Sequence, residues 1–191
     1  AFKQRYPNIL LDVVETDSLE LESLLLKGEL DLAFFNLPIR HDGIEYQLLN
    51  NDEILLILGN NHPSIGRAVQ RSDCKYPWMD FKYFNEIDFI LPAPVQRTRQ
   101  IIDRLFDSHK IEPKIVLTTQ NLHAAIELAA INYGGYFASE THLKHTGMQG
   151  KVQCFSIGDP KTIVNFVVAY RRGAYISKYG QDYIDIVRKS T

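Results

Sequence analysis

Cysteine is scarce in this chain. Among its 191 residues there are two cysteines, Cys74 and Cys154, which stand far apart and in no metal-ligand spacing. Disulfides track oxidising compartments, whereas isolated thiols are typical of reducing ones. We therefore expect two buried or half-buried free thiols and no disulfide.

An excess of positive charge is also absent. The 21 lysines and arginines are outnumbered by 23 aspartates and glutamates, which gives a formal net charge of -2. A nucleic-acid-binding module normally carries a basic surplus that neutralises phosphates. Direct contact between this segment and DNA is therefore not expected.

Long apolar runs and a recognisable signal peptide are missing as well. A membrane span needs about 18 consecutive apolar residues, and no stretch approaches that length, so we expect no membrane association. The chain opens without methionine, and residues 1–7 (AFKQRYP) indicate the end of an amphipathic helix that stops before a proline. We predict that a further segment of the protein precedes Ala1.

The sequence contains no motif typical of catalysis. There is no glycine-rich phosphate loop and no Gly-x-Ser-x-Gly nucleophile elbow. Glu127 and Glu140 do not form a recognisable carboxylate pair. His142 and His145 could share a helix face, but no third metal ligand accompanies them. We expect no enzyme activity, no metal and no cofactor.

What the sequence does contain is an alternation of helix and strand patterns. Residues 9–15 are rich in β-branched side chains and predict a strand. Asp17, with Glu20 three residues later, resembles a capping box, and Gly28 suits the left-handed end of the helix that follows. Residues 31–37 form an apolar run typical of a strand buried on both faces. This order predicts an α/β layer with parallel strands.

Further elements follow the same alternation, interrupted by breaker clusters at residues 59–63 and 158–160. The expected strands are 44–49, 54–58, 88–91, 114–118, 135–138, 152–155 and 163–170. The expected helices are 80–84, 97–109, 122–131, a short one from 141, and 177–189. The chain therefore reads as an α/β protein throughout.

The two breaker clusters divide the chain into two lobes. We expect one lobe at residues 1–59 plus 161–191 and the other at 60–160, joined by two crossing segments. Ligands of open α/β sheets bind beyond the carboxyl ends of the strands, where helices begin. Helix N-termini offer free N–H groups and a favourable dipole to an anion. We therefore expect a cleft for a small anionic or polar metabolite, with closure of the lobes around it.

Helix starts from both lobes supply candidate contacts for that ligand. They are Thr16, Ser18, Gln96, Thr98 and Asn121. Asp17 would oppose an anion, so its neighbours are preferred. Residues of these types also cap helices for stability alone, and that interpretation stays open for each. Phe35 and Tyr136 are candidates for the wall of the cleft, the alternative being that they belong to the core.

Several short motifs follow one another in a fixed order along the whole chain. They are residues 2–7 (FKQRYP) before a strand, the helix start at Asp17, residues 28–33 (GELDLA), His62-Pro63 after an apolar strand, and residues 132–140 (NYGGYFASE). Each is weak alone. Their order and spacing together resemble the effector-binding domain of LysR-type transcriptional regulators.

That resemblance implies a bilobed fold like the type 2 periplasmic binding proteins, with two Rossmann-like lobes and an inducer pocket in the cleft. It implies a cytoplasmic regulator that works as a homodimer or homotetramer and contacts DNA only through an upstream helix-turn-helix domain. Besides the helix-start residues, it makes Pro94 and Ser139 candidate effector contacts.

The sequence departs from the family pattern at two points. The family's first strand, and the hydroxyl-bearing loop after it, are absent from this sequence, so unpaired strand edges and an incomplete site are expected. Asn132 stands where the family often has glycine, and asparagine tolerates the left-handed backbone that ends a helix. The alternative function is a free-standing solute-binding protein of a transport system, which shares the fold.

Overall fold

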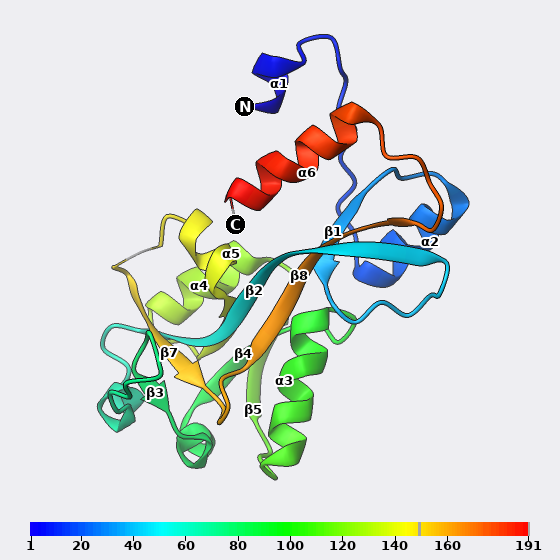
Figure 1. Ribbon diagram of the computed structural model, residues 1–191. Helices are drawn as coiled ribbons and strands as arrows, with labels where there is room; N and C mark the ends of the chain where they lie inside the picture. The colour runs from blue at the N-terminus through cyan, green and yellow to red at the C-terminus, as the bar shows by residue number, and fades with distance from the viewer. Residues whose placement is uncertain (149, 191) are drawn as a thin grey trace. The chain divides into compact units, whose positions relative to one another are not determined.

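The computed structural model describes residues 1–148 and 150–190, with the side chain of His145 outside the described part (Figure 1). The chain forms two compact units. Unit 1 comprises Ala1–Asn51 and Asn165–Thr191, and unit 2 comprises Asp52–Val164. The strand β2 (Ile44–Gly59) crosses the first boundary between the units, and β8 (Ile163–Arg171) crosses the second.

The boundaries expected from the sequence, at 59/60 and 160/161, fall inside unit 2. The physical reason is that the two breaker clusters turn the chain within that unit. Residues after Gly59 enter the 3-10 helix η1 (Pro63–Arg67), which His62 caps, and the N–H of Thr162 donates to the carbonyl of Ile157 at 3.0 Å.

Unit 1 is built around a helix on an antiparallel sheet. Its complete elements are α1 (Phe2–Arg5), α2 (Ser18–Lys27), β1 (Ala33–Asn36) and α6 (Lys178–Ser190). Strand β1 runs antiparallel to β8, with Phe35 opposite Val167. The core joins apolar side chains of α2, β1, β2 and β8: Leu21, Leu25, Ala33, Phe35, Ile44, Val167 and Ala169.

Both ends of α2 follow the sequence prediction. Asp17 Oδ1 accepts from the backbone N–H groups of Leu19 at 2.9 Å and Glu20 at 3.1 Å. Gly28 has a φ of 76°, the left-handed region in which glycine is free of the Cβ penalty. The N-cap and the glycine end of this helix are therefore confirmed.

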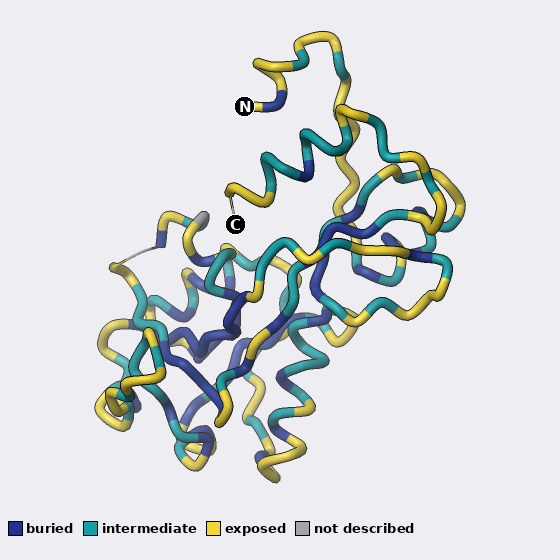
Figure 2. The backbone as a smooth tube through the Cα atoms, viewed as in Figure 1, coloured by how far each residue is buried: buried dark blue, intermediate teal, exposed yellow. Residues whose placement is uncertain are grey.

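Residues 9–15 are not a strand, and this prediction was wrong. The segment has no regular secondary structure and is exposed over most of its length, with Leu10 89% and Val13 76% exposed (Figure 2). A strand forms only where a neighbouring backbone accepts its hydrogen bonds, and no strand of the described chain lies in register with this segment. In unit 1, β1 pairs with β8, and this pairing is antiparallel where the sequence predicted parallel strands.

Strand β2 is one continuous strand where the sequence predicted two. Its exposure is high up to residue 51 and falls sharply from Asp52 to Leu58. The polar residues at its middle look like a break in sequence, yet they pair across the sheet, since Asn165 Nδ2 donates to Asn51 Oδ1 at 2.7 Å.

Unit 2 contains the predicted second series, with bounds within a residue or two of those expected. In chain order the predicted elements are the 3-10 helix η2 (Phe81–Glu86), β4 (Asp88–Pro92), α3 (Arg97–Ser108), β5 (Lys114–Thr119), α4 (Leu122–Ala130), β6 (Tyr136–Ser139), α5 (Glu140–His145) and β7 (Val152–Ile157). The unit also contains η1 and the short strand β3 (Trp78–Met79), which were not predicted. Asn132 has a φ of 62° just after α4, as the sequence predicted for this position.

Helices cover both faces of the strands in unit 2. Alternate residues of β2 face two separate apolar clusters, Ile54 and Leu56 one and Leu55 and Ile57 the other. Helix α3 joins the first cluster through Ile102 and Phe106, among the rings of Phe84, Phe89 and Phe137. Helix α4 joins the second through Ala125, Ile126 and Ala129. Helices α3 and α4 are therefore held on opposite faces of the strands by separate apolar clusters.

Within the described residues, no helix is long and apolar enough to cross a membrane. No group of three or more His, Cys, Asp or Glu side chains in the same described part could hold a metal ion. The side chain of His145, one half of the histidine pair noted in the sequence, lies outside that part. Cys74 and Cys154 are free and half-buried, as predicted.

Candidate functional site

Three helices of unit 2 begin at the same edge of its strands. Strand β4 runs parallel to β5, with Pro92 opposite Thr119, and Gly135, directly before β6, makes a parallel bridge with Phe89. The carboxyl ends of these strands therefore meet at one edge, where α3, α4 and α5 start. The predicted contacts at or beside this edge are Pro94, Gln96, Thr98, Asn121 and Ser139.

The other predicted contacts belong to unit 1 or to the far end of β6. Thr16 and Ser18 belong to unit 1, where Thr16 is exposed and Ser18 is the buried first residue of α2. Phe35 is buried in the core of unit 1. Tyr136 is at the opposite end of β6 from Ser139, and its burial raises the pKa of the phenol to about 12. Packing accounts for the positions of both aromatic residues.

Two of the three helix starts at the edge are closed by side-chain caps. Asn121 Oδ1 accepts from the N–H of Ala124 at 3.0 Å, at the start of α4. At the start of α5, Ser139 Oγ accepts from His142 N at 3.4 Å, and Asp52 Oδ1 accepts from Thr141 N at 3.1 Å. These oxygens satisfy N–H groups that a helix otherwise leaves without partners.

The start of α3 is different. Its N-cap residue, Gln96, makes no side-chain capping hydrogen bond, and the first turn contains no acidic residue. Instead the first turn carries Arg97 and Arg99. Cations are unfavourable near the positive end of the helix dipole, so two arginines in this first turn depart from the usual preference for acidic residues there.

The two arginines have different surroundings. Arg99 Nε donates to Asp103 Oδ1 at 2.7 Å and Arg99 Nη1 donates to the carbonyl of Pro92 at 3.1 Å, which ties α3 to the end of β4. Arg97 is 7% exposed and is the one cationic side chain among the buried polar residues of the described chain. A buried guanidinium needs anionic or hydrogen-bonding company to offset its lost hydration. Arg97 therefore brings a buried positive charge to this edge of unit 2.

A buried acid lies on the strand next to β6. Ile54 of β2 is opposite Ser139, so the preceding residue, Glu53, is at the same edge of unit 2. Glu53 is 7% exposed, and its Oε1 has no hydrogen-bond partner among the described residues. A buried carboxylate oxygen of this kind calls for a donor, which an amine or hydroxyl of a ligand would supply.

Sequence reasoning passed over Arg97 and Glu53. Arg97 carried a readable signal, because two arginines in the first turn of a helix contradict the usual preference for acids there. Glu53 carried none, since its neighbours in sequence look like a polar break between two strands. Its position at the edge follows only from the continuity of β2.

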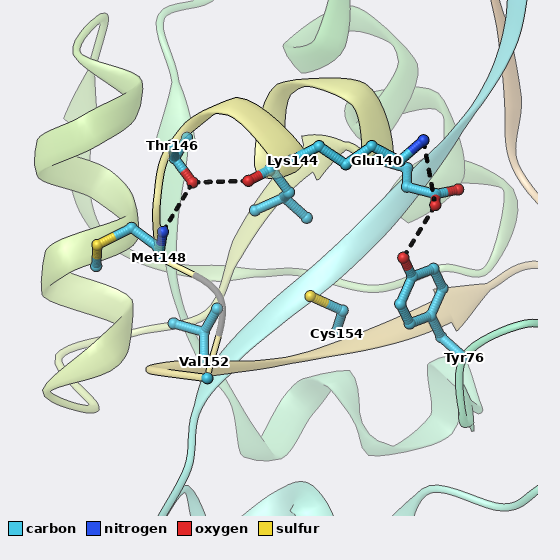
Figure 3. Close-up of a pocket in the computed structure, with 9 residues that line it drawn as sticks. Tyr76, Glu140, Lys144, Thr146, Met148, Val152 and Cys154 are labelled. Carbon is cyan, nitrogen blue, oxygen red and sulfur yellow. Dashed lines mark hydrogen bonds and ion pairs between the residues drawn. The ribbon is translucent and has the colours of Figure 1, made fainter. Parts of the chain in front are cut away.

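A pocket of about 280 Å³ lies in unit 2 between α5, the loop after it, and β7 (Figure 3). Apolar and sulfur-containing side chains line much of it: Leu143, Met148, Val152 and Cys154. Tyr76, Glu140, Lys144, Thr146 and Gly150 complete the lining. Burial, and the nearby charge of Glu140, raise the pKa of the Cys154 thiol to about 11, so this thiol is neutral at physiological pH.

The polar side of the pocket is an ion-pair cluster around Glu140. Its Oε1 accepts from Tyr76 Oη at 3.1 Å and from Lys75 Nζ, and lies 3.7 Å from Lys144 Nζ. Burial opposes ionisation of Glu140, but these donors outweigh it and lower the pKa of the carboxyl. Two ammonium groups thus share one carboxylate, which leaves the rim with a net positive charge.

Solved structures of known proteins share this architecture. The regulatory domain of CcmR from Synechocystis PCC6803, solved in complex with 2-PG, superposes with a TM-score of 0.82 at 21% identity, covering 100% of this chain and 87% of that one. The effector-binding domain of QuiR in complex with shikimate gives a TM-score of 0.74 at 21% identity, covering 98% and 85%. The fold is therefore of the type 2 periplasmic-binding-protein class, as predicted.

The family model described as LysR substrate binding domain matches residues 1–191. The chain belongs to this family, and the resemblance noted in the sequence is confirmed. The transcriptional activator LysR of Escherichia coli (strain K12) is 28% identical over 167 residues, which cover 85% of this chain and 50% of that protein. The chain spans about half to three-fifths of the length of the curated relatives it matches.

Proposed function

We propose that this chain is the effector-sensing domain of a LysR-type transcriptional regulator, and that it recognises a small anionic metabolite at the carboxyl edge of the strands in unit 2. The observation that carries this proposal is the start of α3. Its N–H groups have no side-chain cap, and buried Arg97 stands in its first turn. Helix N–H groups that no side chain caps, together with a cation, form an anion site.

Gln96 and Thr98, predicted from the sequence, would flank the bound anion. Both are half-buried, so a ligand at the helix start could contact them without rearrangement of α3. Pro94 is exposed in the preceding loop and would limit access from that side. Asn121 and Ser139 would contribute from the neighbouring helix starts with whatever hydrogen-bonding capacity capping leaves unused.

Glu53 narrows the class of effector. Its buried Oε1 would accept a hydrogen bond from an amine or hydroxyl of the ligand. A metabolite with both an anionic group and a donor group, such as a hydroxy acid or an amino acid, would meet the positive start of α3 and supply the donor that Glu53 Oε1 lacks. A purely inorganic anion would leave Glu53 Oε1 without a donor.

For the whole protein we propose a regulator that acts as a homodimer or homotetramer and binds DNA through a helix-turn-helix segment outside this chain. Effector binding would favour one arrangement of the two units, because a ligand shifts a conformational equilibrium by its differential affinity for the two states. Relatives that carry the names of transcriptional regulators favour this function over transport, which the fold alone would also permit.

Calorimetric titration of the chain with sulfate, small carboxylates, hydroxy acids and amino acids tests the proposal. Arg97→Gln should weaken the best ligand by about 10-fold to 100-fold, the range for loss of a charge-assisted hydrogen bond. Arg104→Gln is the matched control, since Arg104 is exposed on the same helix and its loss should leave the affinity unchanged. Equal losses in both variants, or binding by neutral apolar compounds alone, would overturn the anion site.

A further inference from the structure

We propose that the pocket between α5 and β7 is a second ligand site, separate from the start of α3, and that it binds a small carboxylate with an apolar body. All of its lining residues belong to unit 2. The volume of about 280 Å³ compares with about 150 Å³ for an engineered apolar cavity that holds benzene. The space therefore suits one ring or a branched alkyl group together with a short polar arm.

The floor of the pocket selects an apolar body. Leu143 and Met148 are buried, and Val152 and Cys154 are half-buried. Figure 3 shows Val152 and Cys154 on β7, with Met148 above Val152. The thiol of Cys154 is uncharged, so the floor presents only carbon and neutral sulfur. Thioether and thiol sulfur atoms make favourable contacts with aromatic rings. A ring placed here would displace water from apolar surface.

The rim of the pocket selects an anion over an amine. Glu140 already has Lys75, Tyr76 and Lys144 as partners, so it has little left to offer a ligand ammonium group. Thr146 Oγ1 is also engaged, because it donates to the carbonyl of Leu143 at 2.8 Å.

Lys144 is the group best placed to receive the anion. Its side chain is 48% exposed, and its ammonium is the more distant of the two that approach Glu140. An ammonium has three donors, so Lys144 can keep its contact with Glu140 and also donate to a ligand carboxylate at the mouth of the pocket.

The thiol of Cys154 gives a readout of this pocket alone. In a Cys74→Ser background, Cys154 is the remaining cysteine, and its alkylation by N-ethylmaleimide can be followed by mass spectrometry. Phenylacetate is the probe. Phenylacetamide is the control without the negative charge, and acetate is the control without the ring. We expect phenylacetate to slow alkylation, by about twofold when its concentration equals the dissociation constant, and the other two compounds to have little effect.

Two variants locate the probe. Lys144→Ala should weaken the protection by phenylacetate about fivefold, the range for an exposed ion pair, while Lys27→Ala, the same charge change on α2 of unit 1, should leave it intact. Val152→Phe should fill the pocket and abolish the protection, with folding checked by circular dichroism. If Val152→Phe fails to fold, the lysine pair decides the question, because both lysines are exposed.

Three outcomes would overturn the proposal. Equal protection by phenylacetamide would show that the pocket does not select a negative charge. If none of the three compounds protects Cys154, the pocket is not a binding site for this class of ligand. Equal weakening by Lys144→Ala and Lys27→Ala would mean that general charge, not this pocket, attracts the probe. None of these outcomes depends on Arg97, so the test separates this site from the proposed effector site.

Discussion

Helices α3 and α4 begin at the same edge of the same strands, yet their starts are built in opposite ways. Helix α4 is closed by Asn121, whose Oδ1 accepts from Ala124 N. Helix α3 has no side-chain cap at Gln96 and places Arg97 in its first turn. A capped start is stable without a ligand, whereas an uncapped basic start has lower stability until an anion arrives. The contrast teaches that two helix starts at one edge can be built for different purposes, and the proposed anion site lies at the uncapped one.

The largest effect is expected where α3 is anchored. Phe106 is buried among the rings of Phe84, Phe89 and Phe137. Phe106→Ala should lower the free energy of unfolding by about 3–5 kcal/mol, because it removes ring contacts and leaves a cavity. Urea denaturation measures this loss, and Arg104→Ala, an exposed change on the same helix, should stay within about 0.5 kcal/mol of wild type. A small loss for Phe106→Ala would mean that α3 is not held by its apolar face.

Converting the start of α3 into a capped one should erase the contrast with α4. Gln96→Asp should raise the free energy of unfolding by about 1 kcal/mol, since the carboxylate accepts from first-turn N–H groups. The same carboxylate should weaken anion binding about tenfold by occupying those groups and repelling the ligand. Thermal denaturation and calorimetry measure the two effects. Gln70→Asp, an exposed change elsewhere in unit 2, is the control, and a gain in both stability and affinity would refute the interpretation.

Removing the cap of α4 tests the other side of the comparison. Asn121→Ala should cost about 1 kcal/mol of stability, through loss of the hydrogen bond to Ala124 N. Asn121→Asp keeps the cap and should keep the stability. The aspartate variant also reports on effector contact, because a carboxylate in contact with a bound anion would weaken its binding. Unchanged affinity in Asn121→Asp would assign Asn121 to capping alone.

The smallest effect is expected at the start of α5. Burial raises the pKa of the Glu140 carboxyl, but hydrogen bonds from Lys75 and Tyr76 together with nearby positive charge outweigh it and hold that pKa below its ordinary value of 4.5. A carboxyl with a lowered pKa stabilises the fold above its unfolded pKa and loses that contribution as the pH falls through its folded pKa.

Glu140→Gln should therefore cost less than about 1 kcal/mol at neutral pH, as for a partly exposed ion pair. The difference from wild type should shrink as the pH falls below 4.5. Chemical denaturation over a pH series follows this change. A difference that stays constant with pH would show that the ionised carboxyl does not contribute.

Two segments rich in β-branched and apolar residues show how far strands can be predicted from sequence. Residues 9–15 and residues 88–92 both read as strands, and only the second is one. The second has β5 beside it in register, whereas the first has no described neighbour. The local pattern of residues indicates the preference of a segment for the strand conformation. A strand also needs a neighbouring strand to hydrogen-bond with, and the local pattern holds no information about that neighbour.

The residues of the candidate site also fall into two groups, those predictable from local sequence and those that depend on the fold. Gln96 and Thr98 were predicted because helix starts can be recognised from their residues. Glu53 and the pocket at Cys154 were not predicted, because burial and adjacency arise from strands distant in the sequence. Arg97 had a signal in the sequence, two arginines in one first turn, but its burial is decided by the fold. Cys154 faces Ile57 across β2 and β7, nearly a hundred positions away in the chain.

By itself, the sequence determined the α/β alternation, the capped start and glycine end of α2, the family, and the bounds of most elements in unit 2. These features depend on side-chain periodicity and on backbone preferences within a few residues. Only the tertiary structure decided that β2 is one strand, that residues 9–15 are not, and that α3 begins without a cap beside a buried arginine. Those outcomes depend on hydrogen-bond partners and desolvation, which are properties of the folded arrangement and not of any local segment.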